Sequence, residues 1–288
     1  MKKSILVVAL SSALIACGGS GGSGDKDSNI VVTPVKAAKL DQTTSVVFAS
    51  SVLYDFDARE TARNIFNMNG YPRNTTTEAC QLGGEIKETN DSNGAKATIT
   101  YHFTECKEEI LFSDVVIITN GSIQVVTEDR NNDGVVDSAL ISYREFRVWA
   151  EDPSHGVNVS TKGSLAFTRQ STNLYEERAN TQTINHVSND IFTKENISLT
   201  FDSKYSDMVP VSASGKVVSS RYGSVILGID PDSKGVTFTG DNSKLTVNRQ
   251  YDSLYSGVSL DLDIDNDGLS DHLGESSALS DDSVIWSY

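Results

Sequence analysis

Short runs in which apolar and polar residues alternate fill most of the chain after Tyr71, and they constrain the fold more than any other feature. The runs are separated by Asn, Asp, Gly and Ser, the residues that favour tight turns. Successive side chains of a β-strand point to opposite faces, so each run predicts a strand with one buried face. The runs include AKATITYHF, SIQVVTED, SALISYREFRVWA, SLAFTRQ, ISLTFDS, GKVVSS, GSVILGID, GVTFTG, SKLTVNRQ and GVSLDLDID. We therefore predict a mostly β fold, an antiparallel meander that forms a sandwich or an open barrel-like sheet.

Residues 37–70 have a different pattern, with apolar side chains at intervals of three and four. Such intervals place side chains on one face of an α-helix, and Arg59 interrupts the series. We predict one or two short amphipathic helices here, ahead of a β-rich region at 71–288. That region is either one domain or two lobes with a soft boundary at residues 151–157, and both remain open. The apolar positions are Val46, Ala49, Val52, Leu53 and Phe56, then Ala58, Ala62, Ile65 and Phe66.

The first residues have the features of an export signal, in which two lysines precede an apolar run too short to span a bilayer. Residues 14–17, of sequence LIAC, resemble the lipobox of bacterial lipoproteins. That resemblance implies removal of residues 1–16 and acylation of Cys17, and several acyl chains give stable membrane anchoring. Residues 17–36 begin with a Gly/Ser-rich stretch and are expected to form a flexible lipidated tether. Gly18, where that family has Asp for inner-membrane retention, favours the outer membrane.

The chain is strongly acidic, with 24 basic and 39 acidic residues and a net charge of −15. Loss of residues 1–16 would remove two lysines and no acid, so the mature chain would be more negative still. Such a surface repels phosphate groups. Nucleic acid and anionic headgroups are therefore poor partners, whereas cations are good ones.

Cys80 and Cys106 remain as an even pair in an exported chain, where oxidising conditions favour a disulfide. In the chain-entropy description, closing a loop of this length stabilises the fold by roughly 3–4 kcal/mol. A redox-active pair is disfavoured, because the spacing is not C-x-x-C and glutamates lie on either side of Cys106.

Two acid-dense stretches share the frame D-x-[DN]-x-D-G-x-x-D. Alternate oxygen-bearing side chains converge on one point when the chain curls round a glycine, and hard oxygen ligands suit Ca²⁺. The frame resembles the first nine positions of EF-hand-type and thrombospondin-like calcium loops, so we expect Ca²⁺ as a structural cofactor. The frame holds Asp263, Asp265, Asp267, Gly268 and Asp271 in the stronger candidate, and Asp129, Asn131, Asp133, Gly134 and Asp137 in the weaker one.

Both loops depart from an EF-hand at the twelfth position, where a bidentate acid is expected. That position is Leu140 after the first loop and Gly274 after the second, and Glu275 comes one residue late. A plain acidic turn that binds no metal therefore remains an alternative for both loops. The density of carboxylates favours metal in the second loop, because concentrated like charge is destabilising without a cation.

No motif for catalysis is present, and we expect no enzymatic activity. The four histidines, His102, His155, His186 and His272, lack the spacing of a zinc site. No nucleophile elbow or phosphate-binding glycine loop occurs. Trp149 and Trp286 fit either a sheet core or a groove for sugar or lipid.

The order of motifs resembles a class of uncharacterised Gram-negative envelope lipoproteins. The resemblance is carried by ACQLGG, YHFTEC, NGSIQVV and GVTFTGDNSKLTVNRQ, placed between the lipobox and DLDIDNDGLSD. In that class a C-x-x-G-G strand pairs with an F-x-x-C strand, which implies a disulfide between Cys80 and Cys106. The class has no known activity to transfer.

These features predict an outer-membrane lipoprotein with a binding or structural role toward an envelope protein or glycan. Two alternatives remain. One is a carrier of lipid or another hydrophobic ligand in a curved-sheet cavity. The other is a hydrolase of envelope polymers, which requires paired carboxylates in a cleft.

Overall fold

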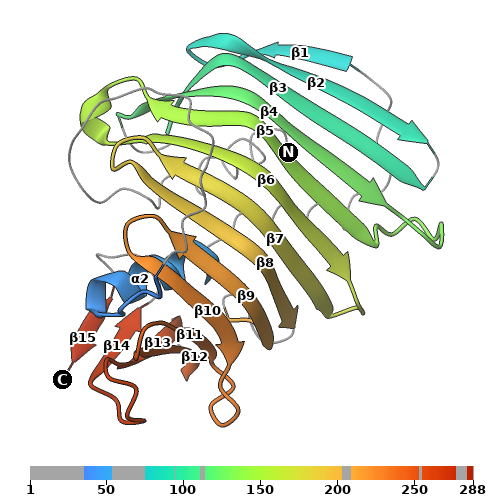
Figure 1. Cartoon of the computed structure of the whole chain (residues 1–288). Helices are drawn as coiled ribbons and strands as arrows, with labels where there is room; N and C mark the ends of the chain where they lie inside the picture. The colour runs from blue at the N-terminus through green and yellow to red at the C-terminus, as the bar shows by residue number, and fades with distance from the viewer. Residues whose placement is uncertain are drawn as a thin grey trace. The chain divides into compact units, whose positions relative to one another are not determined.

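The computed structural model describes residues 36–53, 75–93, 95–110, 114–202, 209–252, 255–276 and 284–287. Within these residues every strand pairs with its neighbours in sequence, in one meander that runs from β1 to β15 (Figure 1). The mostly β, antiparallel fold predicted from the sequence is confirmed. The elements are α2 (Gln42–Leu53), β1 (Thr75–Ala79), β2 (Gly83–Asn93), β3 (Lys96–Glu109), β4 (Val116–Glu128), β5 (Ser138–Ala150), η1 (Pro153–His155), β6 (Asn158–Arg169), β7 (Leu174–Asn185), β8 (Asp190–Asp202), β9 (Ser212–Ser219), β10 (Gly223–Ile229), β11 (Val236–Thr239), β12 (Lys244–Asp252), β13 (Tyr255–Asp263), β14 (His272–Ser276) and β15 (Ile285–Ser287).

The described residues fall into two compact units. The first unit contains residues 75–170 and 180–190, and the second contains 36–53, 171–179 and the described residues from 191 onward. Residues 151–157, where the sequence suggested a soft boundary, form the connection between β5 and β6 inside the first unit.

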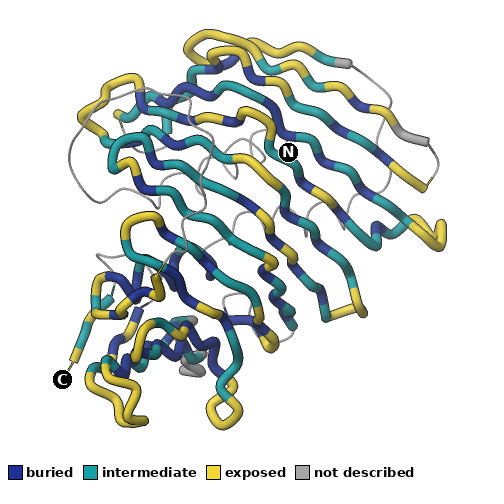
Figure 2. The backbone as a smooth tube through the Cα atoms, in the orientation of Figure 1, coloured by how far each residue is buried: buried dark blue, intermediate teal, exposed yellow. Residues whose placement is uncertain are grey.

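The strands of the first unit have one apolar and one polar face. Across β3, β4, β5 and β6, one row of paired residues is buried and apolar, and the next row along is polar and half-buried. Figure 2 shows this alternation of buried and exposed positions along the strands. Each fully buried side chain of this kind contributes about 1.5–3 kcal/mol. The buried row is Ile99, Val125, Ile141 and Leu165, and the polar row is Thr100, Gln124, Ser142 and Ser164.

A line of β-bulges, here called the glycine crease, crosses the first unit at Gly84, Gly121 and Gly163. A Cβ at any of the three would lie 2.1 Å from a carbonyl oxygen of the neighbouring strand, and all three have positive φ. The pairing register shifts at the crease between β2 and β3, β3 and β4, β4 and β5, and β5 and β6. Bulges bend a strand and increase its twist, and the long strands of this unit bend in Figure 1. The facing carbonyls belong to Glu105, Glu145 and Asn180.

In the second unit, α2 lies against the sheet and contacts β11 (Figure 1). The helix is enclosed rather than amphipathic, because Thr44, Ser45 and Ser50 are buried together with the predicted apolar stripe. Ser50 tolerates burial by donating its hydroxyl to the Val47 carbonyl at 3.1 Å. The second predicted helix and Phe56 lie outside the described residues.

The chain just before α2 is fixed to the second unit by backbone hydrogen bonds. Ala38 donates to the Ser224 carbonyl at 2.8 Å and accepts from the Asp241 amide at 2.6 Å. Glycine makes this approach possible, since a Cβ on Gly240 would lie 2.1 Å from the Ala38 oxygen. The segment that precedes the helix is therefore a structural part of this unit.

Candidate functional site

The two predicted calcium loops occupy similar places, each between two paired strands. The first connects β4 to β5 in the first unit, and the second connects β13 to β14 in the second unit. Positions in both are numbered from the first Asp of the frame, so position 1 is Asp129 or Asp263 and position 9 is Asp137 or Asp271.

The two loops contain the same six hydrogen bonds. The position 1 carboxylate accepts from the amides of positions 5 and 6, and position 5 accepts from the amide of position 7. The amide of position 5 also bonds the position 3 side chain, and position 2 donates to the position 9 carboxylate. Finally, the position 9 amide donates to the carbonyl just before the frame. Side chains accept five of the six bonds, at 2.7–3.3 Å across the two loops, so one local conformation is encoded twice.

Positive φ at positions 4 and 6 completes this shared conformation. Asn132 and Asn266 both have φ of 56°, and Gly134 and Gly268 have φ of 86° and 91°. Asparagine and glycine adopt this region more readily than other residues, which explains their place in the frame.

The second loop gathers three carboxylates. Asp263, Asp265 and Asp267 each offer an oxygen, and these oxygens lie within 4.8 Å of one another. Asp263 is 8% exposed, whereas the other two are exposed. Each backbone amide that bonds these groups offsets part of the repulsion, and a cation would offset much more.

The ninth residue does not join this group. The Asp271 carboxylate instead accepts from the Ile264 amide at 2.7 Å and so closes the loop. Glu275, the late acid of the sequence, lies within β14 opposite Ser259. The structure thus brings together positions 1, 3 and 5 of the expected ligands and uses position 9 as a clasp.

The first loop presents a less favourable set of groups. Asn131 replaces an acid at position 3, and its amide donates to Asp133 Oδ2 at 3.0 Å. Arg130 at position 2 lies 3.8 Å from Glu128 and brings positive charge to the entrance of the loop. Both differences reduce the attraction for a cation relative to the second loop.

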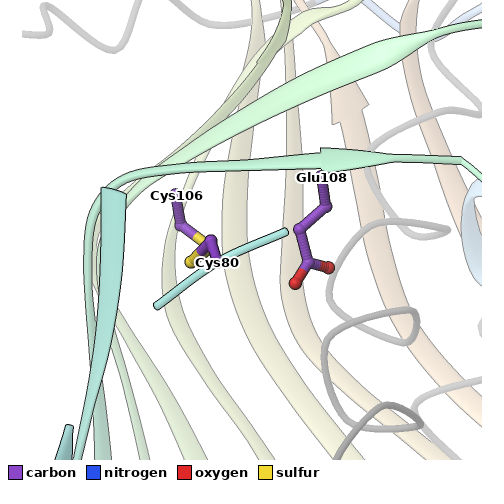
Figure 3. Close-up of side chains that lie close together, drawn as sticks. All are labelled: Cys80, Cys106 and Glu108. Atoms are coloured by element: carbon purple, nitrogen blue, oxygen red, sulfur yellow. A yellow bond between two sulfur atoms is a disulfide. The ribbon is translucent and has the colours of Figure 1, made fainter. Parts of the chain in front are cut away.

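The predicted disulfide between Cys80 and Cys106 is confirmed, with the two Cα atoms 5.4 Å apart. Cys106 directly follows Glu105, the crease residue on β3 with φ of 43°, and Cys80 lies in the turn that joins β1 to β2. Figure 3 shows the Glu108 carboxylate near the bonded sulfurs. Since both sulfurs are oxidised, no thiolate ligand is available, and this trio is not a metal site.

Cys17, the predicted lipidation site, lies outside the described residues, as do the signal at 1–16 and all of the tether except residue 36. Among the described helices, none has the length and apolarity needed to cross a bilayer.

One cluster of interacting polar and aromatic side chains was not identified from the sequence. Around Trp149 on β5, the structure places Arg147, Asn158, Ser160 and His186, which come from three separate stretches of the chain. No short motif connects them, because strand pairing and the bulge register bring them together.

Comparison with protein-family models, with curated proteins and with solved structures finds no match to this chain.

Proposed function

We propose that this protein is a lipid-anchored outer-membrane protein whose β-rich region is a non-catalytic binding or structural module stabilised by Ca²⁺. The lipobox-like residues at 14–17 and the Gly/Ser tether support the anchor. The confirmed disulfide supports an oxidising compartment, since such bonds persist outside the cytosol.

The observation that carries the calcium proposal is the repeated loop conformation. Two stretches 134 residues apart in the sequence, Asp129–Asp137 and Asp263–Asp271, share six hydrogen bonds and two positive-φ positions. In the second, three carboxylate oxygens converge to within 4.8 Å. Oxygen donors arranged in this way suit Ca²⁺ with the affinity of extracellular modules, with Kd of about 10⁻⁴–10⁻³ M.

The test is calorimetric titration of the full chain with Ca²⁺, paired with thermal unfolding in Ca²⁺ and in chelator. Saturable binding together with a raised Tm supports the proposal, since a ligand that binds only the folded state stabilises it. Asp265→Asn removes one charge from the stronger loop and is expected to weaken binding at least several-fold.

Asp232→Asn is the matched control, because Asp232 lies in the turn between β10 and β11, which lacks the frame. Absence of binding up to several millimolar Ca²⁺, or equal weakening by the two variants, would reject calcium as the stabilising ion.

A further inference from the structure

Lys244 on β12 lies directly beside the second loop. It is paired across β12 and β13 with Asp263, which is position 1 of that loop. Directly paired residues of antiparallel strands have their side chains on the same face, with Cβ atoms about 4.5–5.5 Å apart. The flexible four-carbon stem of a lysine spans this separation, so the ammonium can reach the Asp263 carboxylate. In the structure it does not do so, since Asp263 forms no ion pair within the described residues.

The Lys244 ammonium instead binds Asp230, in the turn between β10 and β11. Lys244 Nζ lies 2.8 Å from Asp230 Oδ2, and the two side chains are 33% and 16% exposed. The two oxygens of Asp230 have separate roles. Oδ1 accepts from the amides of Asp232 and Ser233 and from the Ser233 hydroxyl, whereas Oδ2 accepts from Lys244. One oxygen therefore shapes the turn, and the other holds the lysine.

The partner that Lys244 binds is at the far end of β11 from the second loop. Lys244 pairs with Thr239, the last residue of β11, whereas Asp230 follows the end of β10 that pairs with the start of β11. Between these two ends, on the same face, Thr237 pairs with Thr246, and both are buried. The Asp230 carboxylate therefore draws the ammonium along the sheet, away from the acid that lies directly opposite.

The second loop would attract this ammonium if Asp230 released it. Asp263, Asp265 and Asp267 each place an oxygen within 4.8 Å of the others, and none of the three forms an ion pair within the described residues. Carboxylates this close together attract any nearby cation. An ammonium bound to Asp263 would occupy an oxygen that Ca²⁺ needs, because this ion takes about 6–8 oxygen ligands, and it would also repel the divalent ion. A released Lys244 would therefore oppose Ca²⁺ binding.

We propose that Asp230 is a positioning residue for the second loop: it holds the Lys244 ammonium away from Asp263 and so preserves the affinity of the loop for Ca²⁺. This inference rests on the proposed Ca²⁺ site and adds to it a residue that lies outside the acidic frame. Lys244 has two alternative carboxylate partners, and the turn between β10 and β11 determines which of them it binds. Loss of the Asp230 charge converts the lysine into an internal competitor of the metal.

The first test is calorimetric titration of the full chain and its variants with Ca²⁺. Asp230→Asn keeps an acceptor for the turn and replaces the oxygen that holds Lys244 by an NH₂ donor. The Kd for Ca²⁺ should rise about five- to ten-fold. Lys244→Met keeps the length of the side chain and removes its charge, so the double variant Asp230→Asn/Lys244→Met should return the Kd to within about two-fold of the wild type. An unchanged Kd in Asp230→Asn, or an equal rise in the double variant, would overturn the proposal.

Glu195→Gln is the matched control. Lys216 Nζ lies 3.8 Å from Glu195 Oε2 in the second unit, so this substitution also removes one acid and releases one lysine. The strand partners of Lys216 are Glu195 and Ile226, and neither belongs to an acidic loop. The wild-type Kd is therefore expected. A rise equal to that of Asp230→Asn would show that net charge alone sets the affinity, and it would overturn the role of Asp230.

The second test needs no metal and separates this inference from the calcium proposal. In chelator, adding Lys244→Met to Asp230→Asn should lower the Tm by about 2–4 °C, because the released lysine stabilises the loop carboxylates. The same addition should have no effect once Asp263→Asn is also present. Equal Tm values for Asp230→Asn and Asp230→Asn/Lys244→Met would show that the lysine does not reach the loop, and they would overturn the inference whatever the calcium result. The expected Tm loss without Ca²⁺ binding by the wild type would reject calcium as the ion and still support Asp230 as the residue that positions Lys244.

Discussion

Substitution of alanine at Gly121 tests whether the glycine crease is required by close backbone approach. A Cβ at this position would lie 2.1 Å from the Glu145 carbonyl oxygen, at a φ of +100°. Gly134→Ala is the matched control, because Gly134 also has positive φ, at +86°, but has open space around its Cβ position. Both glycines belong to the first unit, so they report on the same folding region.

The expected losses of stability separate the cost of positive φ from the cost of the close backbone contact. Forcing an L-residue into positive φ costs about 1–2 kcal/mol, which is the whole loss expected for Gly134→Ala. Gly121→Ala adds a steric clash that must displace the β5 backbone, and overpacking of this kind costs a further 1–3 kcal/mol. We therefore expect Gly121→Ala to lose about 2–5 kcal/mol of unfolding free energy.

Urea denaturation of the wild type and the two variants, all in chelator, measures these losses as shifts in the midpoint at constant slope. The chelator keeps any metal effect at the loop of Gly134 out of the comparison. Equal losses for the two variants would refute the argument, since they would show that φ alone accounts for the glycine and that the close contact has no energetic consequence.

Three further predictions concern the disulfide, a half-buried ion pair and the segment before α2. Cys106→Ser removes a disulfide with a sequence separation of 26, and chemical denaturation should show a loss of about 2–5 kcal/mol in the free energy of unfolding. Added reductant should cause the same loss in the wild type and no further loss in the variant. The Lys244 ammonium, 2.8 Å from Asp230, lowers the pKa of that carboxyl through a hydrogen bond. The stabilising effect of this ion pair is therefore complete above the unfolded aspartate pKa of about 3.9 and is lost as pH falls through the lowered value. The Tm difference between wild type and Asp230→Asn should consequently shrink in acid. A constant difference from pH 7 to 2 would contradict this. Gly240→Ala should lower stability by about 1–3 kcal/mol because its Cβ would meet the Ala38 oxygen, and an unchanged Tm would contradict that contact.

Strand pattern predicted the fold class well, and the predicted run at 138–150 matches β5 across its bulge, but in β3 and β4 only one side of the bulge was predicted. The run at 95–103 ends just before the crease on β3, whereas the observed strand continues to Glu109. The run at 122–129 begins just after Gly121, whereas β4 begins at Val116. A bulge adds one residue and so reverses which positions face the core, and a search for strict alternation stops there.

β7 was missed for a different reason. Its buried positions include Glu177 and Thr181 as well as Tyr175 and Ala179, so its inward face is not apolar enough to produce an alternating pattern. The enclosed environment of α2 was equally hidden, since serine and threonine on a helix normally indicate an exposed face. In both elements, tertiary packing and side-chain hydrogen bonds determine which positions are buried, and local composition does not show this.

The two candidate sites also differ in how far local sequence could predict them. The acidic frame is local, so its spacing alone predicted both loops and the convergence of positions 1, 3 and 5, but not the use of Asp271 as a clasp. The cluster around Trp149 depends on the pairing of β5 with β6 after a register shift. No single stretch of sequence contains that information.

Pairing of each strand with its immediate neighbours has a consequence for how the chain acquires its structure. Every pairing in the meander joins segments connected by a short stretch of chain, so each strand can add to the preceding one as soon as it becomes available. A chain supplied from its N-terminus can therefore build its sheet progressively, without waiting for a distant partner. The disulfide between Cys80 and Cys106 fits this order, because both of its cysteines lie in the segment from β1 to β3 and can fix the start of the sheet before the rest is added.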